Sequence, residues 1–292
     1  MITSSDRRIA SLTSSGAWGE ETLHGLLAWH AASVPDKMAV SDQPNRRELT
    51  GDTPVVLTWK ELSHAAASLA TQLQGKGLSH GDRVVVQMPN VVELVVCYYA
   101  CSQLGLIISP IPVQYGRHEL EVIAQALEPS AVLTIERLRD QTLAANAREA
   151  LPKIPVLVMG SELVLSSDFA IDPLNSVASD ANQVLSLCWT SGTTGTPKGV
   201  PRTHNMWLAT ARCTIAAGDY RSDDILLNPF PMVNMAALGG FLFPAALLGC
   251  SIVLHHPLDP PLFLQQLQDQ KISFTIAPPA LLNQLAKSAG LW

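Results

Sequence analysis

Charge is scarce in this sequence, and no region of it is strongly basic. Charged residues make up 15% of the 292 residues, and 25 acidic against 19 basic side chains give a net charge of -6. Proteins that bind nucleic acid usually present a basic face to its phosphates. The composition therefore argues against nucleic acid as a partner.

Cysteine is sparse as well, and its spacing excludes two kinds of small stabilised fold. The five cysteines are odd in number and form neither a CxxC pair nor a Cys/His ligand pattern, so neither a disulfide framework nor a zinc module is expected. No apolar core follows Met1–Arg8, so no secretory signal is evident. We predict free, mostly buried thiols, a cytoplasmic location and no protein-held metal. The cysteines are Cys97, Cys101, Cys188, Cys213 and Cys250.

One uncharged run, over Ala236–Leu254, could be mistaken for a membrane-spanning segment. It is nearly long enough to cross a bilayer. Two adjacent glycines, then Pro244 and Gly249, interrupt it, and a His-His-Pro sequence follows directly. A buried helix, a turn and a buried strand explain the run better than a transmembrane segment.

Hydrophobic residues are plentiful, at 47%, and fall in alternating helix-like and strand-like stretches. The clearest helix begins at Thr58, which has capping-box spacing to Glu61, and ends by Gly77. Such alternation predicts an α/β fold with a mostly parallel sheet covered on both faces. Further helices are predicted over 22–32, 93–104, 119–127 and 139–150, and strands over 38–40, 84–88, 106–111, 131–134 and 156–159.

A stretch rich in Ser, Asp, Asn and Pro interrupts this pattern at residues 161–182 and favours a linker. We therefore expect a first α/β subdomain over 1–160 and a second, incomplete one over 183–292. Residues 43–54 are expected to form a surface loop. In the second part, strands are predicted over 184–189, 224–228, 251–255 and 272–276, and helices over 206–217, after Asp259 and toward Lys287.

The most informative stretch runs from Cys188 to Val200, where an apolar strand breaks into glycines, hydroxyls and one lysine. Glycines let a backbone turn tightly and approach a ligand, hydroxyls donate hydrogen bonds to oxyanions, and Lys198 adds positive charge. An ordinary surface turn needs no lysine at a set place, so phosphate binding is favoured over it. Pro197 before the lysine and Gly199 after it exclude a Walker loop.

From Thr190 to Lys198 the sequence closely resembles, at every position, the phosphate-loop signature of the AMP-forming adenylate-forming superfamily, which includes acyl- and aryl-CoA ligases. Leu57–Leu62, Leu104–Ile111 and Arg117–Leu120 resemble further core motifs of that family. The resemblance implies two stacked, mostly parallel sheets covered by helices, as in the N-terminal domain of these enzymes. It also implies that ATP, Mg²⁺ and CoA take part.

In that family a carboxylate attacks the α-phosphorus of ATP, an acyl-adenylate and pyrophosphate form, and a thiol such as that of CoA accepts the acyl group. Lys198 and Thr193 are the catalytic candidates by this resemblance. The expected phosphate site comprises Thr190, Ser191, Gly192, Thr193, Thr194, Gly195, Thr196, Pro197 and Lys198.

A second candidate stretch, Pro229–Gly240, falls where the family has a motif that walls the acid pocket, usually with a histidine or an aromatic residue. Asn234 stands at that place here, next to Met235, with Gly239 following. An amide can bond a carboxylate, but a turn residue at a strand end is an equal alternative. No acidic residue lies between Pro229 and Leu258, which favours an apolar acid: aliphatic, alicyclic or aromatic.

Several later family motifs are absent from this sequence, including the aromatic-Gly-x-Thr-Glu segment and the small C-terminal domain with its catalytic lysine. We therefore expect the N-terminal portion of an acid–CoA ligase, with a dimer or a complementing C-terminal fragment as a possible partner. The alternatives are a non-catalytic nucleotide-binding or partner-binding remnant and an unrelated α/β domain. His204 is predicted to belong to a helix cap rather than to act as a base.

Overall fold

Two open β-sheets form the frame of the chain in the computed structural model, which describes residues 3–165, 180–190, 197–277, 282–283 and 286–287. The larger sheet has the order β6-β5-β3-β4-β7-β8. Its strands are parallel except β8, which runs antiparallel to β7. They are β3 (Arg83–Gln87), β4 (Ile107–Pro110), β5 (Ala131–Ile135), β6 (Val156–Met159), β7 (Val184–Thr190) and β8 (Lys198–Thr203).

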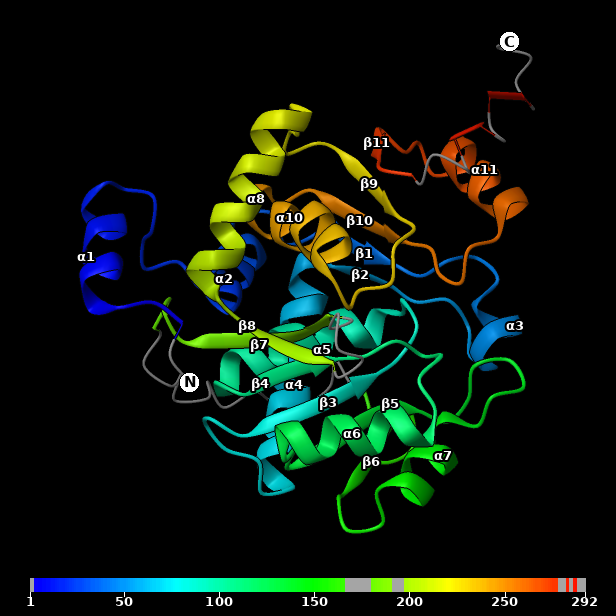
Figure 1. Ribbon diagram of the computed structural model, residues 1–292. Helices are drawn as coiled ribbons and strands as arrows, with labels where there is room; N and C mark the ends of the chain where they lie inside the picture. Colours follow the sequence, from blue (N-terminus) through cyan, green and yellow to red (C-terminus); the bar gives the residue numbers. More distant parts are fainter. Residues whose placement is uncertain (1–2, 166–179, 191–196, 278–281, 284–285, 288–292) are drawn as a thin grey trace.

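The second sheet has five strands in the order β11-β9-β10-β1-β2, and only the edge strand β2 is antiparallel (Figure 1). Its strands are β1 (Met38–Ser41), β2 (Val56–Thr58), β9 (Ile225–Asn228), β10 (Ser251–Leu254) and β11 (Phe274–Thr275). The expected fold of two mostly parallel sheets is confirmed.

Both faces of each sheet are buried. Successive side chains along a strand point to opposite sides, and those on both sides enter hydrophobic clusters. In β3, Val84 and Val86 enter the main core while Val85 enters a separate cluster on the other face. In β10, Ile252 enters the main core and Val253 the small cluster beneath it. This double burial explains why the strands read as continuous apolar runs.

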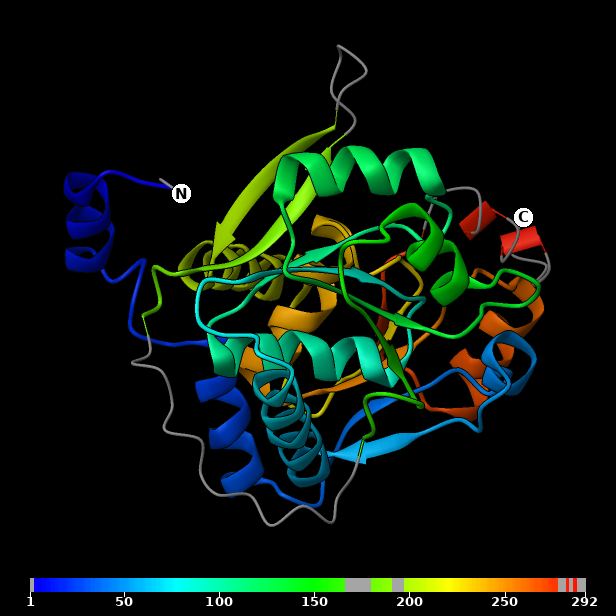
Figure 2. The ribbon, with the colours of Figure 1, turned by 90° about the horizontal axis from the view of Figure 1, so that it is seen from below.

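Helices fill the space between the sheets and cover their outer faces (Figures 1 and 2). The shared core contains residues of α2 (Leu23–Ser33), α4 (Trp59–Gly75), α5 (Val92–Leu104), α8 (His204–Gly218) and α10 (Phe243–Leu248). The outer face of the six-stranded sheet is covered by α6 (Arg117–Leu127) and α7 (Leu143–Ala150), and that of the other sheet by α11 (Pro260–Asp269). The result is a layered α/β fold with one large central core.

The helix start that the sequence predicts at Thr58 is confirmed. The Thr58 side chain accepts a hydrogen bond from the Glu61 backbone N–H, and the Glu61 carboxylate accepts one from the Thr58 N–H at 2.8 Å. This reciprocal pairing is the capping box that the spacing predicts. A short helix α1 (Asp6–Ser14) precedes these elements, has no buried residue and lies apart from the sheets in both views.

The uncharged run Ala236–Leu254 is a buried helical stretch and a strand. It contains the last two residues of α9 (Met235–Ala237), a π-helical turn η1 (Leu238–Leu242), α10 and β10. Within the described residues, no helix is long and apolar enough to cross a membrane.

Two local expectations are corrected by the structure. Residues 43–54 are not simply a surface loop, because they contain α3 (Arg46–Thr50), and the Arg46 side chain is buried in ion pairs. Residues 198–203, for which no strand was expected, form the edge strand β8, which pairs with β7 along its length.

The stretch at residues 161–182 does not separate the strands of one sheet from those of the other. The strands β7 and β8 lie beyond that stretch yet complete the six-stranded sheet, whereas β1 and β2 precede it and belong to the five-stranded one. Parallel strands are joined by crossover connections, so neighbours in a sheet need not be neighbours in sequence.

Candidate functional site

A β-hairpin carries the predicted phosphate stretch, and its two described ends are held together. Thr190, the last residue of β7, pairs with Lys198, the first of β8, and the Thr190 hydroxyl donates to the Lys198 carbonyl at 3.4 Å. Ser191, Gly192, Thr193, Thr194, Gly195 and Thr196 lie outside the described residues. The hairpin brings Thr190 and Lys198 together at the two ends of the loop that joins β7 to β8. Figure 2 shows these two strands running side by side up to that loop.

A second contact anchors this hairpin to the centre of its sheet. The Trp189 indole N–H donates to the Ser109 hydroxyl at 2.8 Å, and Ser109 is fully buried on β4. The sequence drew no attention to Ser109, because nothing local connects it with a residue eighty positions away. The bond fixes the strand end from which the loop departs.

Gly199 has a packing role instead of the expected turning role. It lies inside β8 opposite Trp189, and a Cβ added to it would stand 2.3 Å from Leu187 Cδ2. Contacts that short do not occur in real proteins, so the glycine leaves room for Leu187. The glycine therefore lets β8 pair with β7 beside the Leu187 side chain.

The charged side chain of Lys198 lies at one end of this loop and has no ion-pair partner among the described residues. Its residue is exposed, and no ion pair within the described part of the chain involves its ammonium group. A lysine ammonium offers three donors, which suits phosphate oxygens. Among those same residues, no cluster of His, Cys, Asp or Glu could hold a metal ion.

Asn234 serves as the N-cap of α9. Its side-chain oxygen accepts hydrogen bonds from the backbone N–H groups of Ala236 at 3.0 Å and Ala237 at 3.4 Å. The residue is exposed, and so is Met235 beside it, at 40%. The turn role is therefore present, and within the described residues the amide nitrogen of Asn234 makes no hydrogen bond.

Gly239 is buried in η1 next to the Met235 side chain, whose Cε would stand 3.9 Å from a Cβ added at Gly239. A Cβ there would lie 2.9 Å from Thr210 Cγ2, so Gly239 allows close packing against α8. The structure thus places Asn234 and Met235 on the surface and Gly239 behind them. π-Helical turns often occur at functional sites, and this one directly follows α9.

Both candidate stretches follow the carboxyl ends of parallel strands, the phosphate loop after β7 and the Asn234 turn after β9. Ligands of open α/β sheets bind outside these strand ends. The topology therefore places both stretches where a ligand site is expected.

His204 is a buried, neutral structural residue. It is 3% exposed at the start of α8, and its Nδ1 accepts a hydrogen bond from the Leu23 backbone N–H at 3.2 Å. Burial, and then the neighbouring His24, lower the pKa of His204 to about 3. A histidine that stays neutral and holds a backbone N–H is not a general base, in agreement with its predicted place at a helix start.

Replacing His204 with asparagine is expected to make the protein less sensitive to acid. Because the pKa of His204 is lowered from 6.5 in the folded state, the unfolded chain binds a proton first, and stability is lost as pH falls below about 6.5. Between pH 7.5 and 5.5 this loss is about 1.4 kcal/mol, and His204→Asn, which keeps an acceptor, should remove it. Urea unfolding at both pH values measures the difference. His118→Asn on the exposed surface of α6 is the control, and an equal loss in His204→Asn and the parent would contradict the prediction.

Comparison with known proteins identifies the family of this chain. The AMP-binding enzyme family model matches residues 27–292. The medium-chain fatty-acid–CoA ligase of Escherichia coli (strain K12) is 28% identical over 98% of the chain, and a feruloyl-CoA synthase of Amycolatopsis sp is 30% identical over 79%. The chain spans about half of these relatives, 52% and 45% of their lengths.

A solved structure has a similar fold. The apo structure of Mycobacterium smegmatis MbtA superposes with a TM-score of 0.84 at 25% identity, covering 99% of this chain and 54% of that one. The N-terminal domain of FACL13 from Mycobacterium tuberculosis superposes with a TM-score of 0.76 at 23% identity over 91% of this chain and 65% of that domain.

Proposed function

The chain belongs to the AMP-binding enzyme family, and from that premise we propose that it activates an apolar carboxylic acid with ATP and serves its transfer to CoA. In this proposal the chain is the N-terminal part of such a ligase. It holds the phosphates and the acid, and a complementing C-terminal part or a second copy is its expected partner. The observation that carries the proposal is the hairpin that places Thr190 and the uncommitted Lys198 at one loop mouth.

The phosphate site follows from the chemistry of the hairpin. Hydroxyls from Thr190 through Thr196 would donate hydrogen bonds to the β- and γ-phosphates, and Lys198 would balance their charge. Mg²⁺, when bound, would neutralise charge on the same phosphates. This chain contributes the donors and the geometry that orients ATP for attack by the acid at the α-phosphorus.

The acid site is proposed at the turn after β9, with Asn234 and Met235 as its wall. The exposed methionine suits an apolar acid, and the free amide nitrogen of Asn234 suits a carboxylate. The relatives support a broad class of substrate, since one is described as a medium-chain fatty-acid ligase and another as a feruloyl-CoA synthase. We propose an aliphatic, alicyclic or aromatic acid, in a cytoplasmic setting that suits the free cysteines.

The reaction is tested by ATP–pyrophosphate exchange with the purified chain, Mg²⁺ and a panel of fatty, alicyclic and aromatic acids, alongside calorimetric ATP binding. Exchange that depends on an acid supports the proposal and identifies the substrate class. ATP binding without exchange, even when a C-terminal part is supplied, favours the non-catalytic alternative. Absence of ATP binding by the folded chain would overturn both.

Replacing Asn234 with aspartate is expected to weaken acid binding about tenfold or more while ATP affinity stays unchanged. Aspartate keeps the oxygen that caps α9 but brings a negative charge toward the substrate carboxylate, and two like charges near a protein surface repel strongly. Acid affinity is measured by calorimetry at saturating ATP analogue. Asn146→Asp, which changes an exposed residue of α7 in the same way, is the control. If Asn234→Asp binds acids as the parent does, Asn234 is only a cap.

A further inference from the structure

The turn that leads to Asn234 is held by side chains from the β3–α5 loop and from α5. The Asn90 side-chain amide donates to the Phe230 carbonyl at 2.8 Å, and its oxygen accepts from the Met232 backbone N–H at 3.0 Å. The Tyr98 hydroxyl donates to the Met232 carbonyl at 2.8 Å. Three of the turn's backbone groups are therefore bonded to side chains that precede it by more than a hundred residues.

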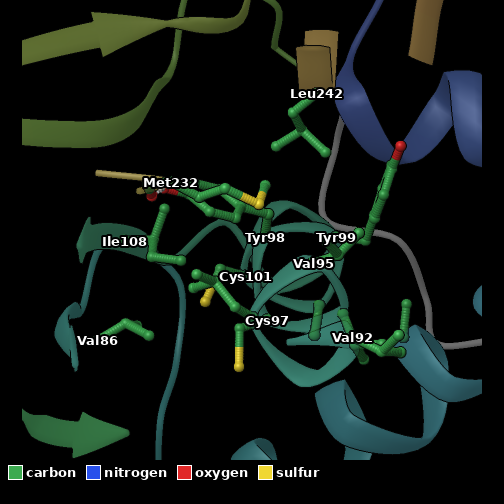
Figure 3. Close-up of a cluster of buried hydrophobic side chains, with 14 of the residues drawn as sticks. Val86, Val92, Val95, Cys97, Tyr98, Tyr99, Cys101, Ile108, Met232 and Leu242 are labelled. Atoms are coloured by element: carbon green, nitrogen blue, oxygen red, sulfur yellow. Dashed lines mark hydrogen bonds between the residues drawn. The ribbon is translucent and has the colours of Figure 1, made fainter. Parts of the chain in front are cut away.

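Both side chains are fixed in the core. Asn90 is 1% exposed and Tyr98 fully buried, the first in the loop between β3 and α5 and the second on α5. Figure 3 shows the Tyr98 ring beside Met232, while Tyr99, the next residue on α5, points away from it. Buried hydrogen bonds of this kind have no water to replace them, so they hold their partners firmly.

Asn90 lies in a loop at the edge of the six-stranded sheet where ligand-binding loops are expected. It follows β3, whose neighbours are β4 on one side and β5 on the other. The connections leave β3 and β4 toward opposite faces, because α5 lies in the central core and α6 in the outer cluster. Strand order reverses at this point, and ligands of open α/β sheets bind beside such a reversal.

We infer that Asn90 and Tyr98 are positioning residues of the proposed acid site and determine which acids it accepts. They act through Phe230–Met232, which leads directly to Asn234 and Met235. Asn90 uses both ends of its amide on this one turn, so its loss frees two backbone groups at once. The wall formed by Asn234 and Met235 then moves with the turn. This inference rests on the proposed function.

The chain offers matched controls for both residues. Asn205 is equally buried and also bonds another backbone segment with both ends of its amide. It accepts a hydrogen bond from the Gly19 N–H and donates one to the Gly19 carbonyl, both at 3.0 Å. Tyr99 is 1% exposed and adjacent to Tyr98. Asn205→Ala should therefore show the general effect of losing buried hydrogen bonds, and Tyr99→Phe that of losing a tyrosine hydroxyl from α5, without any effect on the turn.

The experiment compares Asn90→Ala and Tyr98→Phe with these controls. Hydrogen–deuterium exchange of peptides covering 229–237 reports the turn, and calorimetric affinities for a short and a long acid, with an ATP analogue, report acid choice. We expect faster exchange in that peptide for both variants. The affinity ratio between the two acids should shift about tenfold in Asn90→Ala and about threefold in Tyr98→Phe, with ATP affinity unchanged.

Each outcome decides a different question. A shifted ratio in the two variants and none in the controls supports the inference. An unshifted ratio, or the same shift in Asn205→Ala, overturns it while the proposed function stands. If the unaltered chain binds ATP but no acid, the proposed function and the role in acid choice fall together, although exchange at 229–237 would still show the hydrogen bonds to the turn.

Discussion

Replacing Arg46 with leucine is expected to lower the free energy of unfolding by about 3–5 kcal/mol, the usual loss when one partner of a buried ion pair is removed. Arg46 is 2% exposed and donates to the carboxylates of Asp42 and Glu93, the latter at 2.5 Å. Without the guanidinium, both acids remain buried with no cation. Each must then either carry an uncompensated charge or take up a proton, and both cost free energy.

Asp42 connects this ion pair to three parts of the fold. Its carboxylate also accepts hydrogen bonds from the backbone N–H groups of Val55 at 2.9 Å and Val92 at 2.8 Å, so β1, the segment before β2 and the start of α5 are joined. Burial raises the pKa of Asp42 to about 6, against the lowering effect of Arg46. Arg46 is thus what keeps the carboxylate charged and these bonds strong.

Urea unfolding at pH 7 measures this effect. Arg47→Leu is the matched control, because Arg47 is exposed on the same short helix, and its loss should be within about 0.5 kcal/mol. Adding Glu93→Gln to Arg46→Leu should recover part of the loss, since one buried charge is then removed. A loss below about 1 kcal/mol in Arg46→Leu would mean that the cluster contributes little to stability.

Replacing Lys198 with alanine is expected to weaken ATP binding about tenfold to a hundredfold while leaving the fold intact. A hydrogen bond to a charged group contributes about 1.5–3 kcal/mol, and a phosphate that loses its lysine loses at least one such bond. The Lys198 backbone still pairs with Thr190, and the exposed side chain supports no packing. Acid-dependent pyrophosphate exchange should fall further, because charge builds up on the phosphates in the transition state.

Calorimetric titration with Mg-ATP and the exchange assay measure the two effects. Lys198→Arg should retain part of the binding, because it keeps the charge. Lys153→Ala removes an exposed lysine just before β6 and should bind ATP as the parent does. Should Lys198→Ala and Thr193→Ala both keep the parent's ATP affinity, the hairpin loop is not the phosphate site.

Local chemistry made much of the fold predictable. The capping box at Thr58 and Glu61 and the Thr203 cap of α8 are formed by residues within one turn of each other. The strands buried on both faces, such as β3 and β5, carry continuous apolar runs that can be recognised without knowing their neighbours. The phosphate stretch was recognisable for the same reason, since its pattern is contiguous.

What lay beyond prediction depends on partners far away in the sequence. Arg46 can be buried because it forms an ion pair with Glu93. The turn before Asn234 is held by a hydrogen bond from Asn90. Glycine is needed at position 199 because Leu187 lies across the hairpin.

By itself, then, the sequence determined the α/β class and the ends of the best-capped helices, and it predicted the phosphate stretch, because all of these depend on contiguous residues. Only the tertiary structure decided that β7 and β8 complete one sheet while β1 and β2 join the other. It also decided which buried polar groups meet. A parallel sheet is assembled through crossovers, and a buried polar side chain must bond whatever lies opposite, so both outcomes are properties of the whole chain.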